Sequence, residues 1–105
     1  MIDRERLAEL RNEVGADDLA EVVDLFCEEV EETLDRIRAH PSASIGDDLH
    51  FLKGSALNIG MSEVGRLCLQ AERAWRMDAS SLPDIAPIAQ AFRKARQALY
   101  LELDT

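Results

Sequence analysis

The sequence is poor in basic residues, cysteine, proline and aromatic residues, and it contains no long hydrophobic run. There are 12 Lys and Arg residues against 21 Asp and Glu residues, so the formal net charge is −9 at pH 7. This charge repels nucleic acid and anionic membranes, which bind proteins through clustered Lys and Arg. No apolar stretch approaches the roughly 20 residues of a membrane span. We therefore expect neither nucleic acid nor a membrane as a partner.

The N-terminus and the cysteines argue against an exported protein and against a disulfide-bonded protein. The first residues, MIDRER, are charged at once and precede no apolar signal-peptide stretch, so we expect a cytoplasmic protein. The two cysteines, Cys27 and Cys68, lie among apolar residues and form no CxxC pair. Because disulfides are rare in the cytoplasm, we predict two buried free thiols.

The chain is otherwise typical of a globular protein. Its 105 residues, of which 47% are hydrophobic and 31% charged, suffice for one hydrophobic core. We therefore predict a single domain over residues 1–105. Apolar residues recur at steps of three and four almost throughout, and no alternating run is long enough for a convincing strand. The pattern predicts an all-α protein.

Five helices are expected from this periodicity and from the breaks between its segments. They cover about residues 3–13, 17–39, 45–60, 63–77 and 84–103. Gly15 ends the first, Ser62 is the expected N-cap of the fourth, and Asp84 is the expected cap of the last, with Pro87 in its first turn. Because short connections favour antiparallel neighbours, we predict an antiparallel four-helix bundle with a short additional N-terminal helix.

The third helix carries a histidine on its polar side. Its apolar stripe centres near Leu49, Leu52 and Ala56, and His50 lies roughly 140° from that centre, so we expect the imidazole to face water. The helical neighbours of His50 are Gly46, Asp47, Lys53, Gly54 and Leu57.

The composition of this neighbourhood suggests a phosphate site. A glycine inside a helix costs about 0.5–1 kcal/mol relative to alanine, so two of them beside His50 need a reason. Small neighbours would expose the imidazole to another protein. Lys53 adds a positive charge one turn away, and a neutral imidazole is a competent nucleophile near neutral pH. Phosphoryl transfer requires such positioning and charge neutralisation.

A single histidine in a sequence seldom has a function, so both histidines of this chain could be ordinary surface residues. An exposed helical histidine is usually an ordinary surface residue, and a lysine three positions later is common. His40 precedes Pro41 at an expected helix end. Its position is explained by the favourable interaction of a histidine with the negative end of the helix dipole. We assign no function to His40.

The segment from Leu49 to Gly60, LHFLKGSALNIG, closely resembles the H-x-L-K-G-S signature of histidine-containing phosphotransfer (HPt) domains. The segment from Leu67 to Glu72, LCLQAE, is similar to the L-C-x-x-L-E stretch of the next helix in that family. The matching motifs span about residues 49–72. Ala56 replaces a second serine of some members, and Met61 stands where a smaller residue is frequent.

The resemblance implies a phosphoryl carrier of two-component phosphorelays. His50 would accept a phosphoryl group from a receiver-domain aspartate and pass it to another, the receivers belonging to response regulators and hybrid histidine kinases. Lys53 would stabilise the phosphoryl charge, Gly54 would leave room for the receiver, and Glu72 would hydrogen-bond the other imidazole nitrogen. An ordinary surface glutamate is an equally good reading of Glu72. The chain would bind no cofactor, and the receiver would hold the Mg²⁺.

The docking surface is expected around His50. Leu57 and Met61 lie on its side of the helical wheel as exposed apolar residues, and Gly46 and Asp47 complete the predicted partner-binding set. Ser55 points away from His50 and is predicted to pack between helices.

Three other classes of protein are alternatives to a phosphoryl carrier. A histidine kinase fragment would need a nucleotide-binding domain. The sequence has no Gly-rich loop to hold ATP phosphates, and the bundle leaves too few residues for such a domain, so we expect no kinase activity. A metal-binding bundle needs inward Glu-x-x-His pairs, which neither histidine provides. An interaction adaptor without phosphorylation is opposed by the intact set of His50, Lys53 and Gly54.

The limits at Met1 and Thr105 favour a free-standing shuttle, and the lack of an extended heptad seam is consistent with a monomer.

Overall fold

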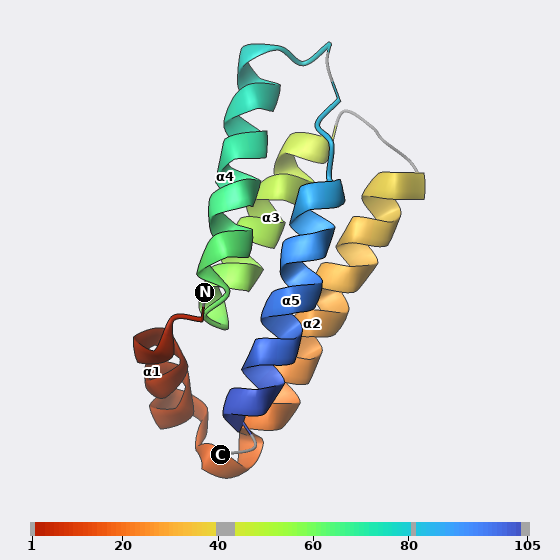
Figure 1. Cartoon of the computed structure of the whole chain (residues 1–105). Helices are drawn as coiled ribbons and strands as arrows, with labels where there is room; N and C mark the ends of the chain where they lie inside the picture. Colours follow the sequence, from red (N-terminus) through yellow and green to blue (C-terminus); the bar gives the residue numbers. More distant parts are fainter. Residues whose placement is uncertain (1, 40–43, 81, 104–105) are drawn as a thin grey trace.

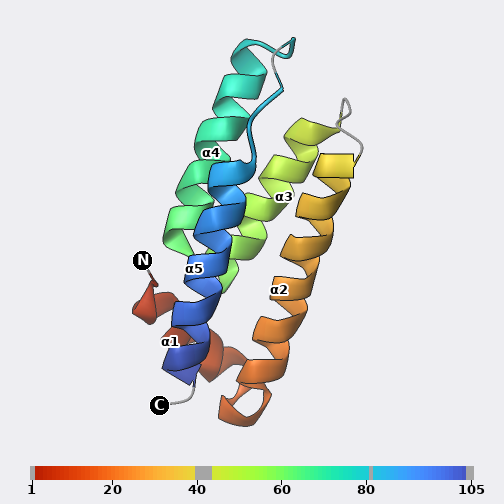
Figure 2. The same cartoon turned by 45° about the vertical axis from the view of Figure 1, so that its right-hand side comes forward.

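Four antiparallel helices form an elongated bundle, with a shorter helix at one end. The computed structural model describes residues 2–39, 44–80 and 82–103. Its helices are α1 (Arg4–Val14), α2 (Ala16–Ala39), α3 (Ile45–Asn58), α4 (Ser62–Met77) and α5 (Ala86–Leu103). Helices α2 to α5 alternate in direction along the bundle, and α1 lies beside its lower end (Figures 1 and 2). The structure confirms the predicted all-α bundle with an added N-terminal helix. The expectation for His40 lies outside the described residues, as do residues 41–43 of the connection before α3.

Apolar side chains from all five helices meet in one core. Val23 and Val30 of α2, Leu49 and Leu52 of α3, and Leu99 of α5 are completely buried. Burying side chains of this size stabilises a fold by about 1.5–3 kcal/mol each. The core therefore holds the helices in fixed rotational phase, and the polar face of α3 is turned outward.

The two cysteines belong to this core. Cys27 and Cys68 are buried and unpaired, as predicted. Burial is the main cause that raises the pKa of Cys27 to about 11 and that of Cys68 to about 12. Both thiols are therefore protonated near neutral pH.

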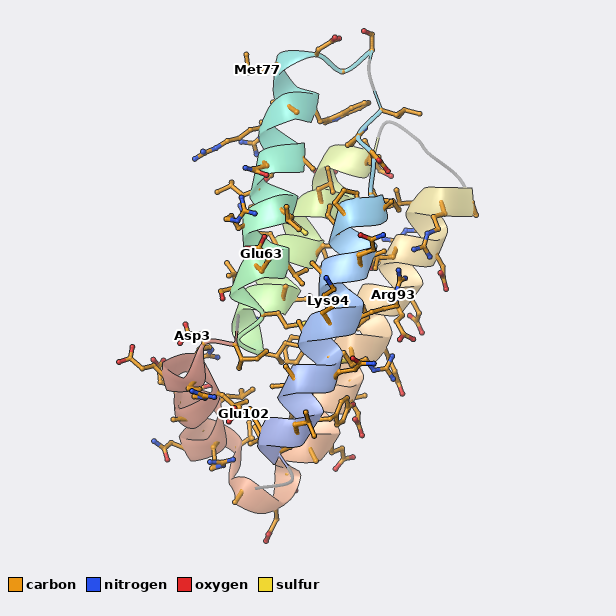
Figure 3. The ribbon with its side chains drawn as sticks, in the orientation of Figure 1. Asp3, Glu63, Met77, Arg93, Lys94 and Glu102 are labelled. Carbon is orange, nitrogen blue, oxygen red and sulfur yellow. The ribbon has the colours of Figure 1, made fainter. Side chains whose placement is uncertain are left out.

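Helix α1 is fastened to the turn between α3 and α4. The Asp3 carboxylate caps α1 by accepting from the Arg6 N–H, and the Asp3 N–H donates to the carbonyl of Gly60 at 2.8 Å. Gly60 has a φ of +79°, which favours glycine, and a Cβ there would lie 2.8 Å from the Asp3 carbonyl oxygen. The ion pair of Arg4 with Glu102 joins α1 to α5, and Figure 3 labels Glu102 near the end of α5 that lies beside α1.

Helix α3 ends at Asn58, two residues before its predicted end, and the predicted cap of α4 is wrong. Helix α4 starts at Ser62, and Met61 is the N-cap, so Ser62 is the first helical residue and not the predicted cap. The cap of α5 is as expected, because the Asp84 carboxylate accepts from the Ala86 N–H. Among the described residues, none of the helices combines the length and the apolar character that crossing a bilayer requires.

Helix α3 packs most extensively against α4, and small residues bring the two helices together. Ser55 is buried between helices, as predicted. Gly65 of α4 lies under Leu57, since a Cβ at Gly65 would be 2.5 Å from Leu57 Cδ2. Because the helices are this close, side chains at one edge of α3 reach side chains of α4.

Candidate functional site

His50 lies on the outer side of α3, at the edge that borders α4. Its side chain is 65% exposed, as the helical phase predicted. The Nδ1 atom is 3.0 Å from Glu72 Oε2, across the interface between the two helices. No described residue forms a hydrogen bond with Nε2. One ring nitrogen is therefore engaged by the protein, and the other is available to solvent or a partner.

Glu72 is buried although it carries a carboxylate. Its side chain is 2% exposed, and it accepts three hydrogen bonds from side chains at the surface. His50 and Arg76 both contact Oε2 at 3.0 Å, and Lys53 Nζ donates to Oε1 at 3.1 Å. A buried carboxylate is costly unless it is paired and hydrogen-bonded, and these donors satisfy that condition.

The charge state of Glu72 fixes the tautomer of His50. Burial on its own raises the pKa of Glu72, but the hydrogen bonds from Lys53 and His50 and the charges of Lys53 and Arg76 lower it. The net shift of the Glu72 pKa is downward, so the carboxylate is ionised near neutral pH and only accepts hydrogen bonds. Nδ1 of His50 must then be the donor, and a neutral ring carries its lone pair on Nε2.

Lys53 is close to His50, as predicted, but its ammonium group is bound to Glu72. The side chain is 23% exposed and lies one turn after His50 on α3. An ammonium group on a four-carbon stem can move between neighbouring anions. The structure therefore places a cation beside the imidazole, held by the same carboxylate that orients the ring.

The two glycines near His50 have different reasons to be glycine. A Cβ at Gly54 would meet nothing within 4 Å, so no contact inside the described structure requires a glycine there. A Cβ at Gly46 would lie 3.0 Å from Trp75 Cδ1, so Gly46 allows the indole of α4 to approach α3. Packing accounts for Gly46, whereas no contact among the described residues accounts for Gly54.

The predicted docking residues divide between surface and core. Leu57 is 46% exposed and Asp47 is exposed, as expected. The expectation that Met61 is exposed is wrong, because Met61 is completely buried. It follows α3 and precedes α4, and its N–H donates to the Ala56 carbonyl, so the wheel of α3 does not extend to it. Met61 therefore does not belong to a docking surface.

Sequence reasoning missed Arg76, the third donor to Glu72. Its side chain is 70% exposed, yet its guanidinium shares Glu72 Oε2 with His50 Nδ1. The spacing of four residues between Glu72 and Arg76 on one helix was the available signal, because such positions face each other. That signal carries weight only when Glu72 is known to be buried beside His50.

The arrangement provides an oriented nucleophile with nearby positive charge. Nε2 of His50 carries a lone pair, the opposite nitrogen is held by a carboxylate, and two cations surround that carboxylate. Within the described ranges, no group of three or more His, Cys, Asp or Glu side chains is suited to hold a metal ion. The geometry fits covalent chemistry at one exposed imidazole nitrogen.

A family model described as Hpt domain matches residues 21–102 of the chain. This stretch contains His50, Lys53, Glu72 and Arg76 and covers most of the bundle. No curated protein and no solved structure gives a significant match.

Proposed function

Because this chain belongs to the Hpt domain family, whose members carry phosphoryl groups on a histidine in phosphorelays, we propose that His50 is the phosphorylated residue. Nε2 of His50 attacks the phosphorus of an aspartyl phosphate on one receiver domain, and the receiver's carboxylate leaves as the P–O bond breaks. In the second half-reaction, the aspartate of another receiver attacks the same phosphorus, and the P–Nε2 bond breaks.

The contact between Nδ1 of His50 and Glu72 is the single observation that carries this proposal. As Nε2 forms a bond to phosphorus, the imidazole gains positive charge, and the adjacent carboxylate stabilises that charge. When the phosphoryl group departs, the same proton stays on Nδ1, and the ring returns to its starting state. The site therefore favours transfer in both directions.

Lys53 and Gly54 support the transfer in different ways. Lys53 Nζ exchanges its bond with Glu72 for one with the phosphoryl oxygens, which lie on the exposed side of the ring. Gly54, one turn after His50, leaves the space in which the receiver's active site approaches Nε2. The lack of any internal contact at a Gly54 Cβ supports this role.

The chemistry that His50 does not supply is assigned to its partners. We propose that the receiver's acidic residues hold the Mg²⁺ required for transfer, and that this chain binds no cofactor and has no kinase activity of its own. The receivers are those of response regulators and hybrid histidine kinases. The chain acts in the cytoplasm and as a monomer in this proposal.

The proposal is tested by transfer from a panel of receiver domains carrying labelled phosphoryl groups, with Mg²⁺ present. The wild-type chain should gain an acid-labile, alkali-stable label, and His50→Gln should gain none. Incubation with labelled ATP alone should label neither protein. Label from ATP on His50 would contradict the carrier assignment, and a folded chain that no receiver labels would favour an adaptor.

A further inference from the structure

A groove between α2 and α3 lies directly beside the His50 site. It has a volume of about 400 Å³, and Glu29, Glu32, Thr33 and Arg36 of α2 form one side. Asp47, Asp48 and Phe51 of α3 form the other side. Phe51 follows His50 in the chain, and Asp47 lies one turn before it, so the groove continues the surface around the imidazole.

The charges in this groove are unbalanced. Among the described residues that line it, Arg36 is the one cation, and Arg36 is already bound to Asp48 at 2.7 Å. Glu29, Glu32 and Asp47 are exposed, and none of their carboxylates has a side-chain partner among the described residues. Four carboxylates therefore face one guanidinium across a small surface. Like charges this close repel one another, and a positively charged partner would relieve that repulsion.

An exposed aromatic side chain lies within this negative surface. Phe51 is 45% exposed, and Leu57 on the same helix is 46% exposed, with Gly54 between them. Aromatic residues at the centre of a contact, ringed by polar groups, are typical of protein interfaces. The apolar centre and the acidic border together describe one surface of mixed character.

We propose that the receiver domain docks on this surface, which is made of Phe51, Gly54 and Leu57 with Glu29, Glu32 and Asp47 at its border. The docked receiver face is apolar opposite Phe51 and positively charged opposite the three carboxylates. The inference rests on the proposed function, because transfer brings a receiver's aspartate to Nε2 and so covers the adjoining surface. Charge complementarity then selects which receivers dock productively. The border residues act on partner specificity and encounter rate and take no part in the chemistry.

The test compares two double variants that change the charge of α2 equally. Glu29→Lys with Glu32→Lys reverses the border of the groove. Asp17→Lys with Glu21→Lys is the matched control, since these exposed residues lie at least eight positions before Glu29 in α2, on the helix face of Asp24, which contacts α5. Phe51→Ala is paired in the same way with Leu101→Ala, which truncates a 69% exposed residue of α5.

Two readouts separate docking from chemistry. The first is the rate of transfer from a phosphorylated receiver that labels the wild-type chain, measured at low and high salt. The second is labelling of His50 by phosphoramidate, a small donor that needs no docking surface. Circular dichroism confirms that each variant is folded.

Reversal of Glu29 and Glu32 should slow receiver transfer at least tenfold at low salt and remove its decline with added salt, and Phe51→Ala should slow transfer at low and high salt alike. Labelling by phosphoramidate and both controls should stay at the wild-type rate. The inference is overturned if the groove variants transfer as fast as the wild type, or if the α5-side control is slowed equally, which would make net charge alone responsible. Failure of the proposed function looks different, because neither phosphoramidate nor any receiver would then label wild-type His50.

Discussion

At the scale of single residues, the site depends on a carboxylate that is buried but partnered. Glu72 lies in the interface of α3 and α4 and accepts from His50, Lys53 and Arg76. One group thereby orients the imidazole, fixes its tautomer and holds two cations next to it. The exposed His50 is ordinary by itself, and its connection to Glu72 distinguishes it from a surface histidine.

Replacing Glu72 should weaken transfer more than it weakens the fold. Glu72→Gln keeps an acceptor for Nδ1 but removes the charge that stabilises the imidazole during transfer, so we expect the rate to fall about tenfold, equivalent to about 1.4 kcal/mol. Glu63→Gln is the control, because Glu63 is on the same helix but is paired with Arg66. Equal rates for wild type and Glu72→Gln would contradict the role of the carboxylate.

Glu72 also makes the stability of the protein depend on acid pH. Its native pKa lies below the unfolded value of about 4.3, so its stabilising contribution is complete above that pH. As pH falls from about 4.3 through the native pKa, the contribution is lost. The difference in free energy of unfolding between wild type and Glu72→Gln, from urea titrations, should therefore shrink below about pH 4.3. A difference that grows on acidification would contradict the downward shift of the Glu72 pKa.

Gly54 should separate stability from function. Because a Cβ at Gly54 meets no atom within 4 Å, Gly54→Ala should raise the free energy of unfolding by about 0.5–1 kcal/mol through helix propensity. The same methyl group intrudes on the receiver, so transfer should slow. Thermal unfolding and receiver transfer measure the two effects, and Gly54→Gln should slow transfer further. A stabilised variant with undiminished transfer would remove the proposed reason for this glycine.

At the scale of helices, the pairing of α3 with α4 creates the site. The periodicity of α3 correctly predicted that His50 and Leu57 are exposed and Ser55 buried, because these residues share one regular helix. It failed for Met61, because the helix ends at Asn58 and Gly60 turns the chain with a φ of +79°. Helical phase does not extend through such a turn.

The turn between α3 and α4 should be sensitive to any side chain at Gly60. Gly60→Ala suffers both a left-handed backbone, costing about 1–2 kcal/mol, and a clash with the Asp3 carbonyl. Gly54→Ala is the control, because Gly54 lies within helix α3 and an added Cβ there meets nothing within 4 Å. In urea titrations, Gly60→Ala should lower the free energy of unfolding by at least about 1–2 kcal/mol, whereas Gly54→Ala should not lower it. An unchanged free energy of unfolding in Gly60→Ala would mean that the turn and α1 adjust to the added methyl group without cost.

Leu57 tests the docking role of the exposed face of α3. Leu57→Asp places a charge where a receiver would cover an apolar side chain, so transfer from a receiver should slow at least tenfold. Met77→Asp is the control, since Met77 is 89% exposed and Figure 3 shows it at the far end of α4. An unchanged transfer rate in Leu57→Asp would remove Leu57 from the docking surface.

At the scale of the whole molecule, the bundle could be predicted because each helix has one apolar stripe and the connections are short. The contact of Glu72 with His50 was implied by the family resemblance alone, and periodicity did not predict it. The burial of Glu72 and the packing of Gly46 against Trp75 depend on the rotation of α4 relative to α3. Periodicity shows which residues of one helix face inward, but it does not show which neighbour they meet.

The central claim is that His50 carries the phosphoryl group on Nε2, because Nδ1 is engaged with Glu72. Nuclear magnetic resonance of the phosphorylated, ¹⁵N-labelled chain tests it most directly, through the coupling between phosphorus and the imidazole nitrogens. We predict that phosphorus is bonded to Nε2 of His50, with Nδ1 protonated and hydrogen-bonded. Phosphorus on Nδ1, or on His40, would contradict the account.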